Sequence, residues 1–316
     1  QDLGPPEDWL VEHKWDGIRA QLIRRGGQMF IWSRGEELIT DRFPDLAPAL
    51  DHVPDGTVID GELLAWDFAA DQPLPFAALQ KRIGRKTVPK TVLRDAPVIL
   101  RAYDVLEFQD TDLRKSTLRQ RRKKLNFIEQ LPLNVPLRLS RALKGTWNDH
   151  AATRAAARDA QAEGLMIKRL DAPYVGGRHK GDWWKWKLDP LTVDAVMIYA
   201  QAGHGRRANL YTDYTFACWK GNELVPFTKA YSGLTDAEFR DITKWVRKNT
   251  LERFGPVRRV PPELVFEIAF EGIQASSRHK SGLALRFPRM ARWRRDKPAA
   301  EANTHADLLE MLDQYG

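Results

Sequence analysis

A lysine in a short polar turn between two apolar, strand-like runs is the feature that most constrains this chain. The stretch reads Glu12-His13-Lys14-Trp15-Asp16-Gly17-Ile18-Arg19. Asp16-Gly17 is a typical turn sequence, so we expect the chain to reverse direction behind the lysine. A lysine amine can attack phosphorus when it is neutral and held in line with a phosphate, and burial near other cations lowers a lysine pKa. Lys14 is therefore either a nucleophile or a solvated lysine on a surface hairpin.

Composition favours two domains and a polyanionic partner. The length of 316 residues suits two domains. The net charge of +8 and the pI near 9.5 suit a phosphate-rich partner. A single cysteine, Cys218, excludes an internal disulfide framework and a multi-cysteine zinc site, and it favours a reducing compartment. No apolar run is long enough to span a membrane.

Apolar runs in the first half of the chain predict a set of strands, at 10–11, 20–23, 29–32, 58–66, 98–106 and 165–168. A basic helix is predicted over 118–131. An alanine-rich helix is predicted over 149–162, with Gly164 as its C-terminal stop.

Composition shifts around Lys187-Leu188-Asp189-Pro190, where we place a hinge. Beyond it, strands are predicted at 193–200, 214–219 and 264–270. Thr235 and Glu238 form a capping box for one helix, and a terminal helix is predicted over 303–312. Strands with one intervening helix suit a small barrel of the OB type. The expected domains are 1–188 and 189–316.

Six short polar motifs, each embedded in an apolar strand or a turn, follow one another in a fixed order. Besides the Lys14 motif itself, the chain carries Ser33-Arg34-Gly35-Glu36, Asp60-Gly61-Glu62-Leu63, Tyr103-Asp104-Val105-Leu106, Glu163-Gly164-Leu165-Met166-Ile167-Lys168, Trp184-Lys185-Trp186-Lys187 and Arg292-Trp293-Arg294-Arg295-Asp296-Lys297.

This ordered set resembles the covalent nucleotidyltransferase superfamily, and most closely the ATP-dependent DNA ligases of bacteria. The likeness runs from Glu12 to Lys297. It implies an α+β fold, in which an adenylation domain of antiparallel sheets with helices precedes an OB-fold barrel and a C-terminal helix. The run from Ser277 to Pro288 is similar to a bacterial subgroup that usually carries an N-terminal DNA-binding domain. The chain starts at Gln1, so we expect that domain to be absent here.

The resemblance implies roles for the nucleotide-binding residues. Lys14 would attack the ATP α-phosphate and become lysyl-AMP. Glu12 would accept a hydrogen bond from the adenine amino group, and Tyr103 would stack on the adenine. Arg19 and Arg34 would contact the ribose or the phosphates, because arginine forks suit phosphate oxygens.

The resemblance also implies a metal and a set of phosphate contacts. Glu62 and Glu163 would bind Mg²⁺, with Mn²⁺ as a substitute, since carboxylate oxygens suit this ion; Glu62 is also a candidate ribose contact. Lys168, Lys185 and Lys187 would neutralise phosphate charge. The segment Arg294-x-Asp296-Lys297 would swing over ATP and orient the pyrophosphate leaving group.

The expected function is sealing of nicks in duplex DNA by a monomer, in DNA repair, recombination and replication, in the cytoplasm at the bacterial nucleoid. Two alternatives remain from the sequence. One is an RNA ligase or a GTP-using RNA capping enzyme, which shares the lysine motif and the barrel. The other is a non-catalytic OB module that binds strands through tryptophan stacking and basic contacts. NAD-dependent DNA ligases are disfavoured, because this chain lacks their multi-cysteine zinc module.

Overall fold

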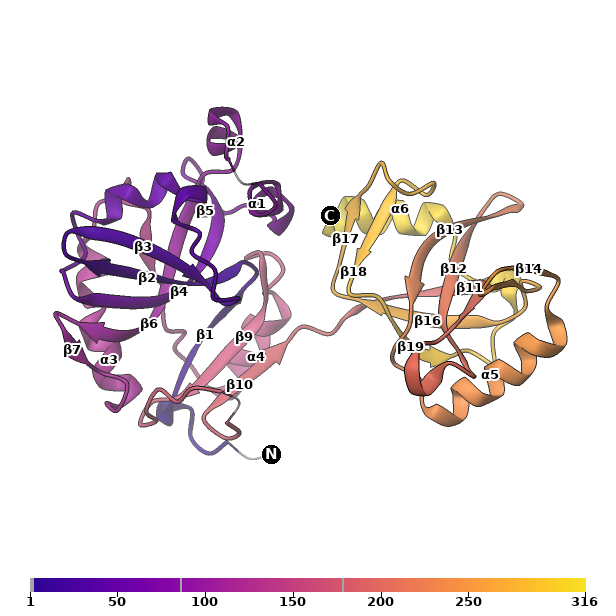
Figure 1. Cartoon of the computed structure of the whole chain (residues 1–316). Coiled ribbons are helices and arrows are strands. Elements are labelled where there is room, and N and C mark those ends of the chain that lie inside the picture. The colour runs from indigo at the N-terminus through magenta and orange to yellow at the C-terminus, as the bar shows by residue number, and fades with distance from the viewer. Residues whose placement is uncertain (1–2, 86, 178) are drawn as a thin grey trace. The chain divides into compact units, whose positions relative to one another are not determined.

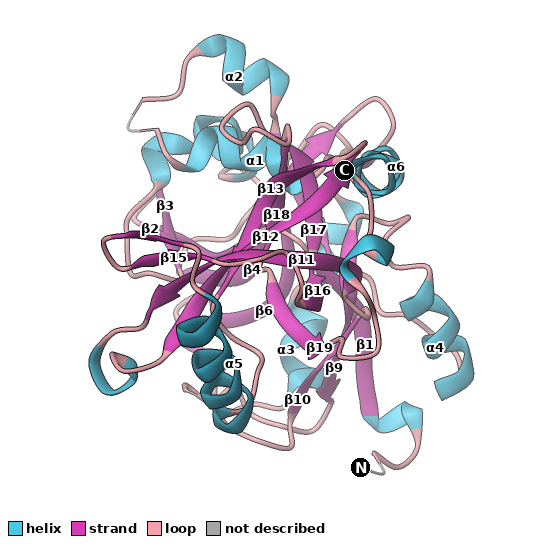
Figure 2. Ribbon diagram, turned by 90° about the vertical axis from the view of Figure 1, so that its right-hand side faces the viewer, coloured by secondary structure: helices cyan, strands magenta, loops and turns pink. Residues whose placement is uncertain are grey.

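The computed structural model describes residues 3–85, 87–177 and 179–316. The chain divides into two compact units, 1–188 and 189–316 (Figure 1). Each unit has its own cluster of buried hydrophobic residues. Strands are the main elements of the chain, and helices are fewer (Figure 2). All pairings between the described strands are antiparallel except that of β6 with β8, and the α+β class expected from the sequence is confirmed. None of the described helices is long and apolar enough to cross a membrane.

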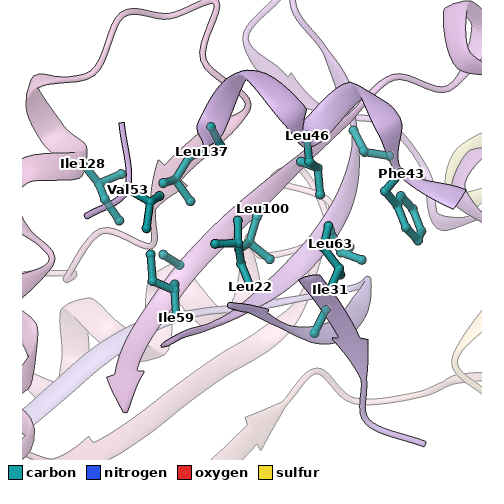
Figure 3. Packing of buried hydrophobic residues seen from close by; sticks show 14 of the residues in the cluster. Leu22, Ile31, Phe43, Leu46, Val53, Ile59, Leu63, Leu100, Ile128 and Leu137 are labelled. Carbon is teal, nitrogen blue, oxygen red and sulfur yellow. The ribbon is translucent and has the colours of Figure 1, made fainter. Parts of the chain in front are cut away.

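A large sheet forms the body of the first unit. Its order is β3-β2-β4-β6-β7, with the short strands β5 and β8 paired to β4 and β6. The bounds are β2 (Ile18–Arg25), β3 (Gln28–Ser33), β4 (Thr57–Asp67), β5 (Gln72–Pro73), β6 (Val98–Phe108), β7 (Thr111–Asp112) and β8 (Leu137–Leu139). One face of this sheet carries the main apolar core, in which Leu22, Ile59 and Leu100 meet (Figure 3).

A second, smaller sheet of the first unit has the order β1-β9-β10. Its strands are β1 (Trp9–Trp15), β9 (Ala162–Arg169) and β10 (Trp183–Lys187). Side chains alternate between the two faces of a strand. One face packs as an apolar cluster of Trp9, Val11, Leu165 and Ile167 with Trp184 and Trp186. The other face is therefore available for polar side chains.

Four α-helices belong to the described part of the first unit: α1 (Phe76–Ile83), α2 (Lys90–Asp95), α3 (Leu118–Lys124) and α4 (Trp147–Ala155). The helix predicted over 118–131 is in fact α3 followed by a 3-10 turn, Asn126–Gln130. The helix predicted over 149–162 ends at Ala155, and its expected stop, Gly164, lies inside strand β9. Both predictions overextended a helix, because apolar periodicity does not mark where tertiary packing ends it.

The second unit is built on a sheet ordered β13-β12-β11-β15-β14, with β16 joining β11 to β19 and a separate hairpin of β17 and β18. The strands are β11 (Leu191–Ala202), β12 (Tyr211–Lys220), β13 (Glu223–Ala230), β14 (Glu252–Phe254), β15 (Val257–Arg259), β16 (Val265–Phe270), β17 (Gly272–Ala275), β18 (Leu283–Arg286) and β19 (Arg289–Trp293).

Two helices complete the second unit. Helix α5 (Asp236–Asn249) begins at the predicted capping box, in which the Thr235 and Glu238 side chains satisfy each other's backbone N–H groups. Its Phe239, Ile242 and Val246 lie at helical spacing and are buried in the core of the unit. The predicted terminal helix is α6 (His305–Tyr315), capped by Thr304.

Candidate active site

Lys14 lies in strand β1, near its end, and not in the turn that the sequence suggested. Alternation along the strand places Glu12 and Lys14 on the face opposite the Trp9 and Val11 cluster. The Lys14 side chain is only 18% exposed, and its ammonium group forms an ion pair with the Glu163 carboxylate. The expected nucleophile is thus a half-buried side chain on the polar face of the small sheet.

The strand register brings the other predicted lysines to this same face. Met166 lies opposite Glu12 on β9, and Lys185 lies opposite Met166 on β10. By the same register and alternation, the face also carries Lys168 and Lys187. Five predicted site residues therefore share one face because three antiparallel strands alternate in phase. They are Glu12, Lys14, Lys168, Lys185 and Lys187.

A β-bulge in strand β9 turns Glu163 toward Lys14. His13 pairs with Leu165, but Trp15 pairs with Ala162, so β9 has one extra residue at this point. Gly164 lies in the bulge with a φ of +131°, and a Cβ there would come within 2.3 Å of the Trp186 carbonyl oxygen. A bulge of this kind redirects a side chain. Glycine at 164 is therefore required for the contact between Glu163 and Lys14.

Glu62, on β4, is a second carboxylate beside Lys14. Burial is the largest effect on it and raises its pKa to about 8, while Lys14 acts in the opposite direction and Asp60 and Glu163 add to the increase. Gly17 explains how the turn after Lys14 reaches this strand, since a Cβ at Gly17 would lie 2.2 Å from the Leu63 carbonyl oxygen. The turn glycine thus permits the close approach of Lys14 to Glu62.

A buried ion pair joins Glu12 to Lys168. Both side chains are 2% exposed, and the Lys168 ammonium lies over the rings of Tyr103 and Trp183, at 4.3 and 4.4 Å from their centres. The Arg122 guanidinium is 3.7 Å from the same carboxylate. One Glu12 oxygen, Oε2, is buried and accepts no hydrogen bond within the described chain. It is this oxygen that lies 3.7 Å from Arg122 Nη1, beyond hydrogen-bond distance.

Arg19 belongs to a polar network formed by residues of the large sheet and by Tyr174. Its guanidinium donates to both carboxylate oxygens of Asp60, at 3.1 and 2.6 Å, and to the Tyr174 hydroxyl at 2.6 Å. The Tyr103 and Tyr174 hydroxyls also donate to Asp60. Burial, with Asp60 next, raises the pKa of both tyrosines, so they remain protonated donors. The predicted contacts Arg19 and Tyr103 therefore belong to one network.

Arg34 lies beside Arg19 but differs from it in environment. Its backbone N–H donates to the Arg19 carbonyl oxygen at 3.2 Å, just after β3 ends. Its side chain is exposed. Arg34 therefore borders the site and is placed to reach a ligand from the solvent side.

The two carboxylates near Lys14 are suited to Mg²⁺ but do not form a complete cage for it. Across residues 3–85, 87–177 and 179–316, no three or more His, Cys, Asp or Glu side chains are grouped to hold a metal ion. Mg²⁺ is commonly bound by one or two carboxylates together with substrate phosphates and water. Glu62 and Glu163 match that donor set.

The second unit places Arg294 and Lys297 together. The Arg294 Nη1 and Lys297 Nζ atoms donate to the same oxygen of Asp194, at 2.8 and 2.7 Å. Arg294 also donates to Asp296 through Nε and Nη2. The three predicted residues of this motif are thus joined in one ionic cluster, with Asp194 on β11 as its fourth member.

Sequence reasoning missed four residues of these two clusters: Asp60, Tyr174, Trp183 and Asp194. Asp60 lies inside a quoted motif but was given no role, and Trp183 lies one residue before the quoted motif that starts at Trp184. Tyr174 lies in a loop with no periodic pattern. Asp194 is a lone carboxylate within an apolar strand run, and such a residue signals a buried partner.

Comparisons with known proteins identify the family of this chain. A family model for the ATP dependent DNA ligase domain matches residues 4–187, and one for the ATP dependent DNA ligase C terminal region matches residues 207–297. A "Probable DNA ligase" of Koribacter versatilis is 38% identical over 94% of this chain and 55% of its own length. Another, of Opitutus terrae, is 40% identical over 98% of this chain and 33% of its own length. The chain thus spans about half the length, or less, of these curated relatives.

Solved structures show the same fold. A structure from a study of Lig E DNA ligases covers 92% of this chain and 94% of its own, with a TM-score of 0.62 and 20% identity. The ligase domain from M. tuberculosis LigD covers 94% and 93%, with a TM-score of 0.50 and 22% identity. The expected combination of an adenylation domain with an OB-fold barrel is confirmed.

Proposed function

The chain belongs to the ATP-dependent DNA ligase family, and from that premise we propose that it is a catalytic core that seals nicks in duplex DNA through a lysyl-AMP intermediate. One observation carries the proposal: Lys14 lies on a polar sheet face between two carboxylates, Glu62 and Glu163, with Lys185 and Lys187 on the same face. A solvated hairpin lysine would not have these neighbours.

In the first step, Lys14 Nζ attacks the α-phosphorus of ATP. A P–N bond forms, the bond from that phosphorus to the bridging oxygen breaks, and pyrophosphate leaves with the electron pair. The ion pair with Glu163 holds the amine in place, and the Lys14 ammonium must first give up a proton, which the Glu163 carboxylate can accept, because only the neutral amine has a lone pair to donate. In-line attack also requires that the nucleotide be fixed at both ends.

We assign the base to the buried end of the site. Glu12 Oε2, which accepts no hydrogen bond from the described residues, would accept one from the adenine amino group, and the Tyr103 ring would stack on the base. The geometry favours a different role for Lys168 from the phosphate contact implied by the resemblance: its ammonium is buried against Glu12 and fixes that carboxylate. Guanine has a carbonyl in place of the amino group, so this arrangement favours ATP over GTP.

The remaining cations are proposed to bind the ribose and the phosphates. Arg19, already oriented by Asp60, and the exposed Arg34 would contact the ribose or the α-phosphate. Lys185 and Lys187 would neutralise the charge that develops in phosphoryl transfer. Arg294 and Lys297 would orient the pyrophosphate. Glu62 and Glu163 would hold Mg²⁺, or Mn²⁺ in its place, which supplies further neutralisation of the phosphate oxygens.

Two further steps complete the proposed reaction. An oxygen of the DNA 5′-phosphate attacks the phosphorus of lysyl-AMP, the P–N bond breaks, and AMP passes to the DNA. The 3′-hydroxyl then attacks the 5′-phosphate, forms the phosphodiester and releases AMP.

Because the proposed substrate is DNA, we expect the protein to act at the nucleoid, in the cytoplasm of a bacterium. We infer that a monomer suffices, since one chain supplies all these groups, and that this core normally works linked to an N-terminal DNA-binding domain.

A nick-sealing assay tests the proposal. The protein is mixed with a labelled nicked duplex, Mg²⁺ and either ATP, GTP or NAD, and a nicked RNA duplex is run in parallel. We expect sealed DNA with ATP only, and no product from Lys14→Ala. Lys123→Ala, which changes an exposed lysine on α3, is the matched control and should seal normally. A preference for GTP or for RNA would favour the alternative enzymes, and DNA binding without sealing would favour the non-catalytic module.

A further inference from the structure

The Asp194 carboxylate binds two cationic side chains, those of Arg294 and Lys297. Its Oδ2 atom accepts hydrogen bonds from Arg294 and from Lys297, at 2.8 and 2.7 Å. The residue is 8% exposed and lies in strand β11, whereas its two partners follow strand β19. Ion pairs between exposed side chains contribute little, but this carboxylate is largely withdrawn from water.

The backbone of Asp194 is held in place by two hydrogen bonds to Asn303. Its backbone N–H donates to the Asn303 side chain at 2.8 Å, and its carbonyl oxygen accepts from the Asn303 N–H at 2.9 Å. On the other side, the Arg294 N–H donates to the Val265 carbonyl oxygen. Both ends of the contact are therefore fixed by backbone hydrogen bonds. The second carboxylate oxygen, Oδ1, is buried and accepts no hydrogen bond from the residues that the structure describes.

The positive charges of Arg294 and Lys297 repel each other, and the negative charge of the Asp194 carboxylate that both of them contact offsets this repulsion. We propose that Asp194 is a positioning residue for the first chemical step: it holds the Arg294 guanidinium and the Lys297 ammonium side by side, so that pyrophosphate meets them as one preorganised pair. The inference rests on the proposed function and adds a residue to it. Asp194 itself touches neither ATP nor the reacting atoms.

Asp296 provides a natural comparison. Its carboxylate also binds Arg294, but it is 63% exposed and, within the described residues, forms no ion pair with Lys297. Removing it would loosen one cation at the surface. Removing the Asp194 charge would release both cations and leave them to repel each other. We therefore expect removal of the Asp194 charge to slow formation of enzyme–AMP more than removal of the Asp296 charge does.

The test is Asp194→Asn, which keeps the shape and one acceptor but removes the charge. We expect formation of enzyme–AMP at saturating ATP to slow at least about tenfold, the loss typical of one charge-assisted hydrogen bond. In the reverse reaction, release of ATP from enzyme–AMP, the KM for pyrophosphate should rise. Sealing of a pre-adenylylated nick should keep the wild-type rate, because no pyrophosphate takes part in it. Asp296→Asn should slow adenylylation less.

The outcomes separate the possible errors. An Asp194→Asn variant that forms enzyme–AMP at the wild-type rate overturns the inference. So does a lower KM for pyrophosphate, which would mean that Asp194 masks the two cations. Equal losses in adenylylation and in sealing would show a merely structural role, and a thermal melting curve of the variant would identify misfolding as its cause. If the wild-type protein forms no AMP adduct, the proposed function itself fails.

Discussion

The Glu12–Lys168 pair gives the sharpest prediction about stability. Both side chains are 2% exposed, so the two opposite charges are buried together and each compensates the other where water cannot. Lys168→Met keeps the length of the side chain but leaves the Glu12 carboxylate with Arg122 alone, at 3.7 Å. Removing one partner of a buried pair typically costs about 3–5 kcal/mol. We expect a loss of about 3 kcal/mol, at the low end of that range, because Arg122 partly compensates the charge.

The reverse change tests the same pair from the other side. Glu12→Gln leaves the Lys168 ammonium with the rings of Tyr103 and Trp183, and each such contact is worth about 1–2 kcal/mol when desolvated. This variant should therefore lose less, about 2 kcal/mol. In the double variant neither charge is left alone, so the combined loss should fall short of the sum by about 2 kcal/mol.

Hydrogen–deuterium exchange measures the effect within the first unit. Peptides from β1 and β9 report the free energy of opening of the small sheet, without interference from the unfolding of the second unit. Peptides from α5, which belongs to the second unit, serve as an internal control whose exchange should not change. Additive losses in the double variant would refute the reasoning, because they would show that the two charges do not depend on each other.

Three further predictions concern the metal, the bulge and the DNA. Glu62 has a pKa of about 8 and must lose a proton to bind Mg²⁺, so the affinity for Mg²⁺ should weaken about tenfold from pH 9 to pH 7. Glu62→Gln should abolish this pH dependence. A Mg²⁺ titration of the wild type that shows the same affinity at both pH values would exclude Glu62 as a metal ligand. Gly164→Ala should slow enzyme–AMP formation and lower the melting temperature, because the new Cβ would clash with the Trp186 carbonyl oxygen and displace Glu163. Normal adenylylation by this variant would show that the reaction does not need the bulge. Binding to a nicked duplex should be weak at physiological salt, and the logarithm of the affinity should fall linearly with the logarithm of the salt concentration, by about 0.9 per phosphate contacted. Fusion of an N-terminal DNA-binding domain should tighten this binding without changing the rate of AMP transfer to Lys14. Tight, salt-independent binding by the chain alone would contradict this prediction.

Period-two apolar patterns and local capping rules made parts of the fold predictable. The strands around 20–23, 58–66 and 98–106, and the helix that begins after Thr235, appear in the structure because alternation and caps act locally. Helix ends were less predictable. Residues 156–161 have the alanine content of a helix, yet the chain leaves α4 at Ala155 because β9 must start at Ala162 to pair with β1.

The site residues were selected from motifs, but their arrangement could not be read from the sequence. Strand alternation would have placed Glu12 and Lys14 on one face, and it would have placed Glu163 on the opposite one. Only the bulge at Gly164, which depends on pairing with β1, brings Glu163 to Lys14. Lys168 looked like one more phosphate contact, and its burial against Glu12 depends on residues 156 positions apart in the chain.

The central claim is that Lys14 carries AMP, and intact-mass spectrometry tests it most directly. The protein is first treated with pyrophosphate to remove any AMP already present, then incubated with ATP and Mg²⁺, and finally mixed with a nicked duplex. We expect a mass increase of one AMP on the wild type, located on the peptide that contains Lys14, and its loss when the nicked DNA is added. Lys14→Ala should show no increase, and Lys123→Ala should behave as the wild type. An adduct that persists in Lys14→Ala, or one located on another residue, would contradict the claim.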